Sequence, residues 1–432
     1  MSTALLTDHY ELTMVDAARA SGRAERETVF EVFSRQLPGG KRYGVVAGTG
    51  RLIEAIQQFR FHQNELEFLA RESIVSDDTL EWLSHYRFRG TIRGYREGET
   101  YVPGSPILQV RGTFAEAVLL ETLILSILNY DSAIASAASR MVQAAGSRDL
   151  IEMGARRAHE HAAVAAARAA YIAGFSATSN LAAGERYGIP TKGTAAHSFT
   201  LAHDSEEEAF AAQIRTMGSG TTLLIDTFDM VKGVERAIAI GGTNLGAVRI
   251  DSGDLPVVVS QVRAHLDQLG ATATKIVVTN DLNEHTIAGL RGAPVDVFGV
   301  GTSVVTGSGY PAAGLVYKLV ARTDDDGAWV PVAKKSSDKA HHAGAKNAFR
   351  VLESGVATGE ALVVGEATPP EGSRPLSHDL MVEGAASDSA LQPELLARAR
   401  AHHRDAIAEL PDAAFSLSPG DPSFSAFVVG ES

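Results

Sequence analysis

Cysteine is absent from all 432 residues of the chain. Without cysteine the chain forms no disulfide scaffold, no zinc–thiolate site, no iron–sulfur cluster and no thiolate nucleophile. Any catalysis therefore depends on His, Asp, Glu, Arg, Lys, Ser, Thr or Tyr.

Positive charge and long apolar runs are also scarce. The 39 Lys and Arg residues stand against 52 Asp and Glu, so the formal net charge is −13. This argues against a protein that coats nucleic acid, because such binding needs clustered cations. The longest uncharged stretches, such as 169–184, fall short of the roughly 20 apolar residues of a bilayer span. The start, MSTALLTDHYELTM, has no basic region and does not read as a secretory signal. We expect a cytoplasmic protein without membrane or nucleic-acid partners.

What is present is ordinary globular composition, with 45% hydrophobic and 21% charged residues. Residues 28–37 alternate apolar and polar side chains, and residues 88–112 mix β-branched residues with Gly and Pro, so we expect a β-rich N-terminal domain over 1–115. Leucines in helical phase over 116–130, followed by an alanine-rich helix over 132–145, predict linking helices to about 149.

The rest of the chain divides into two further zones. We expect an α/β domain over 150–322 and a C-terminal segment over 323–432 that packs partly with the N-terminal domain. In the C-terminal segment, residues 328–333 resemble a strand and residues 393–410 a helix. The basic cluster of Lys334, Lys335, Lys339 and Lys346 is interpreted as a solvated loop.

The α/β zone repeats one pattern: a short apolar run ends in small or polar residues, and a helical segment follows. Such alternation predicts parallel strands joined by crossover helices. In a closed barrel the strand ends converge on one face, where active sites lie. The expected strand ends are 174–180, 193–198, 226–229, 251–254, 279–283 and 299–303.

The turn Asp251-Ser-Gly-Asp254 follows the apolar strand that carries Arg249. Glycine permits a tight turn, so both carboxylates can address one ligand. Vicinal ribose hydroxyls, Mg²⁺ or a guanidinium are suitable partners. A turn that merely caps the next helix is the equally simple alternative.

Three other polar segments are candidate ligand sites. The backbone N–H groups of Gly299–Ser303 and the hydroxyls of Thr302 and Ser303 can hold a phosphate, although a plain tight turn has the same pattern. His197 can act as a base, a nucleophile or an orienting group, or simply as a hydrogen-bonded histidine. Arg156 and Arg157 suit an anion site or a solvated helix start. The pairs His159/His161, His341/His342 and His402/His403 lack zinc-site spacing and are expected on the surface.

Five motifs in this order and spacing make the chain resemble the nicotinate phosphoribosyltransferase family from about Leu5 to Arg350. They are LLTDHYELTM (5–14), EMGARR (152–157), GTAAHS (193–198), RIDSGD (249–254) and GVGTSVVT (299–306). The resemblance implies the fold of type II phosphoribosyltransferases: an irregular (β/α) barrel, a flanking β-rich domain, and active sites shared across a homodimer.

The resemblance also implies roles for individual residues. His197 corresponds to a phosphorylated histidine, Arg249 and Thr194 to nicotinate contacts, and Thr302 to a phosphoribosyl-phosphate contact. Tyr10 corresponds to a tyrosine that stacks on the pyridine ring from the neighbouring subunit. The other expected substrate-binding residues are Arg156, Ser179, Asp254, Gly301 and Ser303, and Asp251 is expected to be catalytic. Met153 stands where many relatives have an aromatic residue.

The expected reaction joins nicotinate to phosphoribosyl pyrophosphate, giving nicotinate mononucleotide and pyrophosphate, with Mg²⁺ and with ATP hydrolysis coupled through His197. Nicotinamide as the substrate is the closest alternative, but amide-using relatives place an aspartate where this chain has Ser179. A phosphate-binding isomerase or aldolase would need a strand-end base, for which Lys192 is the one isolated lysine. A non-catalytic regulatory barrel would have no need for these polar strand ends.

Overall fold

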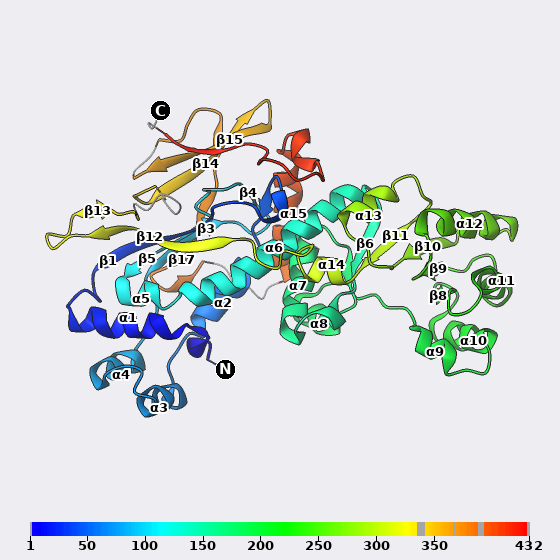
Figure 1. The fold of residues 1–432 in the computed structure, drawn as a ribbon, viewed down its shortest axis with the longest axis horizontal. Helices are drawn as coiled ribbons and strands as arrows, with labels where there is room; N and C mark the ends of the chain where they lie inside the picture. Colours follow the sequence, from blue (N-terminus) through cyan, green and yellow to red (C-terminus); the bar gives the residue numbers. More distant parts are fainter. Residues whose placement is uncertain (1, 335–341, 366–367, 388–392, 430–432) are drawn as a thin grey trace. The chain divides into compact units, whose positions relative to one another are not determined.

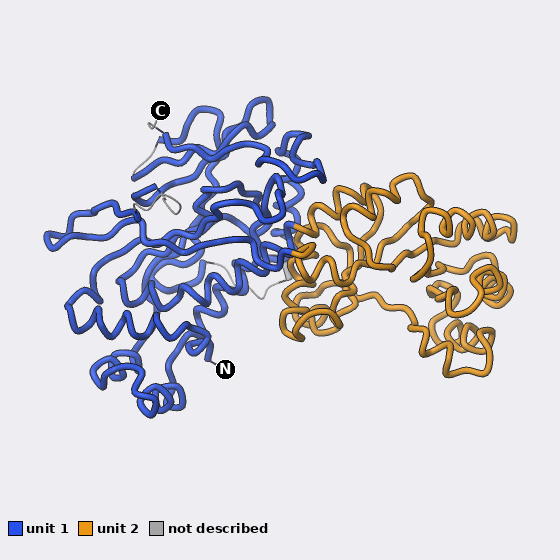
Figure 2. Tube along the Cα trace, viewed as in Figure 1, with its two compact units in different colours: residues 1–136, 310–432 blue, residues 137–309 orange. Residues whose placement is uncertain are grey.

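The computed structural model describes residues 2–334, 342–365, 368–387 and 393–429. The chain forms two compact units: residues 1–136 together with 310–432, and residues 137–309 (Figure 2). The domain limits expected near residues 115, 149 and 322 stay predictions.

The first unit is built on a seven-stranded antiparallel sheet (Figure 1). Alternate residues of its central strands, such as Phe30, Ile92 and Val110, enter one large hydrophobic core. The strands run in the order β13 (Trp329–Pro331), β12 (Leu315–Thr323), β1 (Glu27–Ser34), β5 (Leu108–Thr113), β3 (Thr91–Tyr95), β17 (Ser377–Val382) and β18 (Ala385–Ala386).

Helices and a small ribbon complete the core of this unit. The ribbon pairs β2 (Gly44–Val45) with β4 (Thr100–Tyr101). The helices are α1 (His9–Ala20), α2 (Thr49–Gln57), α3 (Gln63–Arg71), α4 (Asp77–Ser84), α5 (Phe114–Val118), the first part of α6 (Glu121–Ala145), and α15 (Pro393–Ala408).

The helices expected over 116–130 and 132–145 are divided differently: residues 116–118 belong to α5, and α6 runs without a break from Glu121 to Ala145. Polar side chains on it serve the interior: Ser136 Oγ accepts a hydrogen bond from the Val45 N–H at 2.8 Å. Residues Phe114–Ala145 form the one helical stretch in the described chain that is long and apolar enough to cross a membrane, and most of it is buried inside the protein. Such burial is typical of a helix that packs in a hydrophobic core.

A second, four-stranded sheet lies in the same unit, in the order β16 (Ser373–Pro375), β14 (Lys346–Glu353), β15 (Val356–Val364), β19 (Ala426–Val428). A buried ion network ties it to the rest of the unit. Arg350 donates to Glu360 at 2.8 Å, and Arg374 forms paired hydrogen bonds with both Glu99 and Glu409. Burial alone would raise the pKa of Glu99, but hydrogen bonds from His402 and Arg374 outweigh it and hold that pKa well below its usual range.

Two expectations for the C-terminal segment are wrong. Lys346 is not in a solvated loop: it is 4% exposed, and its Nζ lies 2.7 Å from Glu31 Oε2. Lys335, Lys339 and His341 lie outside the described residues. His403 is not on the surface, because α15 buries it with Nδ1 2.8 Å from the Gly98 carbonyl oxygen.

Buried His403 leads to a testable pH dependence. Burial lowers its pKa from 6.5 to about 4, so between these values the unfolded chain binds a proton that the folded chain does not. Stability should therefore fall as the pH drops through this window, by about 3 kcal/mol from this residue in total. Urea unfolding across the window should show a shallower pH slope for His403→Asn than for the wild type. His85→Asn, at an exposed histidine, should keep the wild-type slope. An unchanged slope in His403→Asn would contradict the assignment.

The second unit is an α/β layer structure around a parallel sheet, which confirms the expected fold class (Figure 1). The strand order is β7 (Ala177–Thr178), β6 (Asp149–Glu152), β11 (Val297–Val300), β10 (Lys275–Val278), β9 (Ala247–Ile250), β8 (Thr222–Leu224). Its helices are the end of α6, α7 (Glu160–Ile172), α8 (Leu181–Tyr187), α9 (His197–Leu201), α10 (Glu206–Met217), α11 (Met230–Gly241), α12 (Leu255–Gln268), α13 (Glu284–Gly289) and α14 (Thr302–Val305).

The two edges of this sheet are not paired with each other, since β7 and β8 end the strand order within residues 137–309, all of which are described. Residues 188–196, which connect α8 to α9, extend between these edges instead. Thr191 in this segment forms a single parallel bridge with Thr178 of β7, and Thr194 and Ala195 accept hydrogen bonds from Arg249 on β9. Strand pairing therefore does not close this sheet, and the expected barrel is not confirmed. His197 lies at the start of α9, not at a strand end as expected.

Candidate active site

Polar residues meet at the carboxyl ends of the parallel strands, as parallel topology requires. They line a cavity of about 220 Å³, which includes residues from the ends of β6, β9, β10 and β11. The lining residues are Met153, Arg156, Arg157, Arg249, Asp251, Thr279, Asn280, Asp281, Gly299, Gly301 and Thr302.

Arg249 is the most firmly held cation of this cavity. Its Nε donates to Thr279 Oγ1 at 2.9 Å, and its Nη1 donates to Thr194 Oγ1 at 2.7 Å and to the Ala195 carbonyl at 3.2 Å. Nη2 lies 3.3 Å from Asp251 Oδ1, which also accepts a hydrogen bond from the Thr279 hydroxyl. Strands β9 and β10 and the segment before α9 therefore orient the guanidinium of Arg249, whose side chain is 14% exposed.

Two aspartates and His197 form a second group. Asp226 Oδ2 accepts hydrogen bonds from the Asp251 N–H at 2.8 Å and from Ser252 Oγ at 2.6 Å. Asp226 Oδ1 is buried, has no hydrogen-bond partner among the described residues, and lies 3.8 Å from His197 Nε2. Asp251 Oδ2 lies 3.9 Å from the same nitrogen. A positive charge on this imidazole would therefore face two carboxylates.

The opposite nitrogen of the imidazole has its own partner. His197 Nδ1 shares a hydrogen bond of 3.1 Å with Thr227 Oγ1, and the side chain stays 40% exposed. The ring is thus oriented and still accessible, which suits a group that exchanges something with a ligand.

Two further arginines of the cavity follow β6, in the short 3₁₀ turn Ala155–Arg157. Arg156 and Arg157 are exposed, line the cavity and pair with no carboxylate among the described residues, so they can bind an anion.

Buried Glu152 connects the start of this turn to strand β7. It is 0% exposed and accepts hydrogen bonds from the Gly154 N–H and the Thr178 hydroxyl. Burial raises its pKa, and these two hydrogen bonds oppose the rise. One carboxylate therefore braces the turn that carries Arg156 and the strand end that carries Ser179.

The glycine-rich loop after β11 brings part of the predicted phosphate segment to the cavity. Gly301 and Thr302 line it, whereas Ser303 is not among the lining residues. Gly299 is required by a close approach, because a Cβ there would lie 2.7 Å from Met153 Sδ. The Met153 thioether thus forms part of the cavity wall.

The remaining predicted residues lie outside this cavity. Ser179 N–H donates to the Glu152 carbonyl at 2.8 Å, just after β7. Asp254 is the exposed N-cap residue of α12, although its carboxylate accepts no capping hydrogen bond. Tyr10 belongs to the other unit, on α1, and is 43% exposed. Burial and nearby Glu121 raise its pKa to about 12, so it stays a neutral phenol.

Several residues in or around the cavity were not given a role from the sequence. Thr279 and Asp226 belonged to expected strand ends but were given no role, and their position directly after apolar runs was the available signal. Asn280 and Asp281 carried only the same weak signal, although Asp281 has a left-handed φ of 33° that the sequence does not reveal. Glu152 looks like any strand residue until its burial is known.

Comparisons with known proteins agree with this geometry. Residues 5–129 match the family model of the nicotinate phosphoribosyltransferase (NAPRTase) N-terminal domain, and residues 149–354 match that of the nicotinate phosphoribosyltransferase (NAPRTase) family. Nicotinate phosphoribosyltransferase pncB1 of Mycobacterium tuberculosis (strain ATCC 25618 / H37Rv) is 54% identical over 430 residues, covering 97% of this chain and 94% of that protein. Nicotinate phosphoribosyltransferase of Bacillus subtilis (strain 168) is 39% identical, covering 81% and 74%.

Solved structures give the same answer for the fold. The crystal structure of human nicotinic acid phosphoribosyltransferase superimposes with a TM-score of 0.84 at 26% identity, covering 98% of this chain and 97% of that one. The crystal structure of nicotinate-nucleotide pyrophosphorylase from Pyrococcus furiosus shares the fold at a TM-score of 0.77 and 21% identity. The resemblance seen in the five motifs is confirmed, and the chain belongs to the nicotinate phosphoribosyltransferase family.

Proposed function

We propose that this protein transfers the phosphoribosyl group of phosphoribosyl pyrophosphate to the ring nitrogen of nicotinate, in the salvage route to NAD. The observation that carries the proposal is Arg249, whose guanidinium is oriented by Thr279 and Thr194 at a cavity with two further arginines. Nicotinate and phosphoribosyl pyrophosphate are both anions, and such a site binds anions.

The chemistry needs placed charges more than it needs a base. The pyridine nitrogen is already a nucleophile, so no proton has to be removed from it. As pyrophosphate leaves, positive charge develops at the anomeric carbon of the ribose, and a nearby carboxylate stabilises it. Asp251 is the carboxylate we assign to this role, because Arg249 and Thr279 hold one of its oxygens and leave Oδ2 without a hydrogen-bond partner among the described residues.

Mg²⁺ fits this site as a companion of the pyrophosphate. No group of three or more His, Asp and Glu side chains within the described residues could hold a metal ion by itself. Mg²⁺ typically uses one or two protein carboxylates together with substrate phosphate oxygens and water, and Asp251 Oδ2 offers one such ligand. The ion would supply charge neutralisation on the leaving group.

ATP coupling is assigned to His197. An oriented, partly exposed imidazole with two carboxylates near Nε2 can accept a phosphoryl group and become a phosphohistidine. Hydrolysis of that phosphoramidate would then draw the sugar transfer forward.

Selectivity for the acid over the amide is assigned to Ser179 together with Arg249. A cation attracts the carboxylate of nicotinate, and a serine hydroxyl does not repel it as an aspartate would. Tyr10, on α1, is assigned to stack on the pyridine ring from the neighbouring subunit of a homodimer, and its exposed ring is available for such a contact. We place the reaction in the cytoplasm.

One assay tests the proposed function. The full chain is incubated with phosphoribosyl pyrophosphate, Mg²⁺ and ATP, and with nicotinate, nicotinamide or quinolinate in turn. Nicotinate should give its mononucleotide at a kcat/KM far above the other two. Preference for nicotinamide, or turnover of none of the three, would refute the proposal.

The glycine-rich loop gives a sharper test of the substrate's position. Thr302→Ala should raise the KM for phosphoribosyl pyrophosphate by about ten- to a hundredfold and leave the KM for nicotinate nearly unchanged, because a hydrogen bond to a charged group contributes roughly 1.5–3 kcal/mol. Ser303→Ala is the matched control and should have a smaller effect, since Ser303 does not line the cavity. Equal effects of Thr302→Ala on both substrates would identify the loop as a structural turn.

A further inference from the structure

The seven-stranded sheet of the first unit has a second face that does not enter the hydrophobic core. Across its central strands, Arg111 lies in register with Val29 on one side and Thr91 on the other, and Gln109 lies in register with Arg93. Because side chains alternate along a strand, these residues share one face. Their neighbours in the chain point the other way, into the core: Phe30, Ile92 and Val110.

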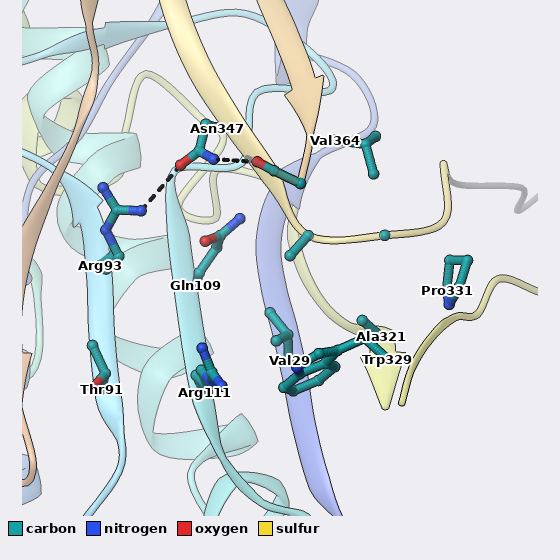
Figure 3. Close-up of a pocket in the computed structure, with 13 residues that line it drawn as sticks. Val29, Thr91, Arg93, Gln109, Arg111, Ala321, Trp329, Pro331, Asn347 and Val364 are labelled. Carbon is teal, nitrogen blue, oxygen red and sulfur yellow. Dashed lines mark hydrogen bonds between the residues drawn. The ribbon is translucent and has the colours of Figure 1, made fainter. Parts of the chain in front are cut away.

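A cavity of about 600 Å³ opens on this face (Figure 3). Its volume lies within the roughly 300–1,000 Å³ of typical small-molecule sites, and most of its lining is apolar, with a few polar groups from neighbouring strands. Each of the described residues that line it belongs to the first unit, so the cavity is separate from the 220 Å³ cavity of the second unit.

The charge of this cavity is not balanced. Arg93 is neutralised by Asp379, 2.9 Å from its Nε, and donates to Asn347 Oδ1 at 3.0 Å. Arg111 has no carboxylate partner among the described residues. Its guanidinium lies over the ring of Trp329, 4.9 Å from the ring centroid, and that tryptophan is 42% exposed. A cation without a carboxylate partner among the described residues therefore stacks on an exposed indole.

This pair defines a ligand chemistry. The guanidinium suits a phosphate or carboxylate, and the indole suits a planar ring. A single aromatic acid would leave much of the volume unfilled, whereas a base, a sugar and a phosphate together suit it. We propose that the cavity is a second ligand site that binds a mononucleotide, with its phosphate against Arg111 and its base against Trp329. The proposal does not depend on the proposed function, because it uses no residue of that site.

Trp329 itself provides the measurement. The chain has two tryptophans, Trp82 and Trp329, so a Trp82→Phe variant leaves one indole, inside the cavity. Adenosine monophosphate should cause a saturable change in its fluorescence. Inorganic phosphate, which has no ring, and nicotinate, which is too small to fill the cavity, should each bind at least about tenfold more weakly. Phosphate binding as tightly as the nucleotide would overturn the proposal.

Matched arginine variants locate the site. Arg111→Ala in the Trp82→Phe background should weaken binding by at least about tenfold. Arg71→Ala removes an exposed arginine that also stacks on an aromatic ring, 5.5 Å from Phe68, and should have no effect. Arg249→Ala should likewise leave the Trp329 signal intact, because its site is in the other unit.

Equilibrium dialysis of labelled adenosine monophosphate keeps the proposal testable if Trp82→Phe does not fold. The wild type should bind one nucleotide more per chain than Arg111→Ala. Equal stoichiometry and affinity in these two proteins, no saturable signal at Trp329, or an equal loss in Arg71→Ala would each refute a mononucleotide site at Arg111.

Discussion

Arg249→Ala is expected to lower kcat/KM for nicotinate by about 30-fold to a few thousandfold. Removing one partner of a desolvated charge pair costs roughly 2–5 kcal/mol, because the other charge stays buried and unpaired. Arg249 also joins Thr279, Thr194 and Asp251, so its loss releases the segment before α9 as well. Steady-state kinetics with each substrate varied in turn measure the effect.

One further variant of Arg249 separates its charge from its geometry, and a variant of Arg263 serves as the control. Arg249→Lys keeps the charge but cannot reproduce the contacts of Nε and Nη1 together, so it should recover little activity. Arg263→Ala is the matched control in the same unit, since Arg263 bonds the carbonyls of Thr274 and Ala271, before the start of β10, away from the carboxyl ends of the strands. Wild-type kcat and KM in Arg249→Ala would remove Arg249 from the substrate site.

The strand ends of the second unit were predictable because their signal is local. Strands β8, β9 and β10 are short and mostly apolar, and a polar residue follows within two positions: Asp226 after β8, Asp251 after β9 and Thr279 after β10. Parallel strands then bring these residues to one edge without further information. The turn after β9 also needs Gly253, whose φ of 89° is natural for glycine alone.

The environment of His197 was not predictable in the same way. The motif GTAAHS contains small residues and no β-branched run, and only one bridge, at Thr191, connects its approach to the sheet. The segment then extends to Arg249, 55 residues later in the chain, and α9 starts at His197. A contact between residues so far apart leaves no local pattern, so the residue was identified while its helix was missed.

The prediction of which side chains are exposed in the first unit failed for the same reason. Lys346 and His403 belong to segments that look solvated, and each is buried by a distant partner, Glu31 and the Gly98 carbonyl respectively. Charged residues are rarely buried unless paired, and the sequence does not show which pairs will form. The parallel pairing of β15 with β19 is equally non-local.

His197→Ala is expected to abolish the stimulation of nicotinate mononucleotide formation by ATP while a slow ATP-independent reaction remains. The reason is that phosphoryl storage and sugar transfer depend on different chemical groups. His197 Nε2 faces Asp226 and Asp251 and is free to accept a phosphoryl group, whereas the sugar transfer uses the nucleophilicity of the pyridine nitrogen and needs no base. Product formation with and without ATP, followed for wild type and variant, measures the effect.

The same variant decides where the phosphoryl group is carried. Wild-type protein incubated with γ-labelled ATP should acquire a label that is lost in acid and kept in base, as a phosphoramidate requires, and His197→Ala should stay unlabelled. Thr227→Val tests the orienting hydrogen bond at Nδ1 and should slow labelling without abolishing it, because Nε2 keeps its two carboxylate neighbours. Full ATP stimulation in His197→Ala, or a label on another residue, would disprove phosphoryl storage at His197. Loss of all sugar transfer would instead place this imidazole against the phosphoribosyl group, since only a contact with that substrate would then explain why the ATP-independent reaction needs it.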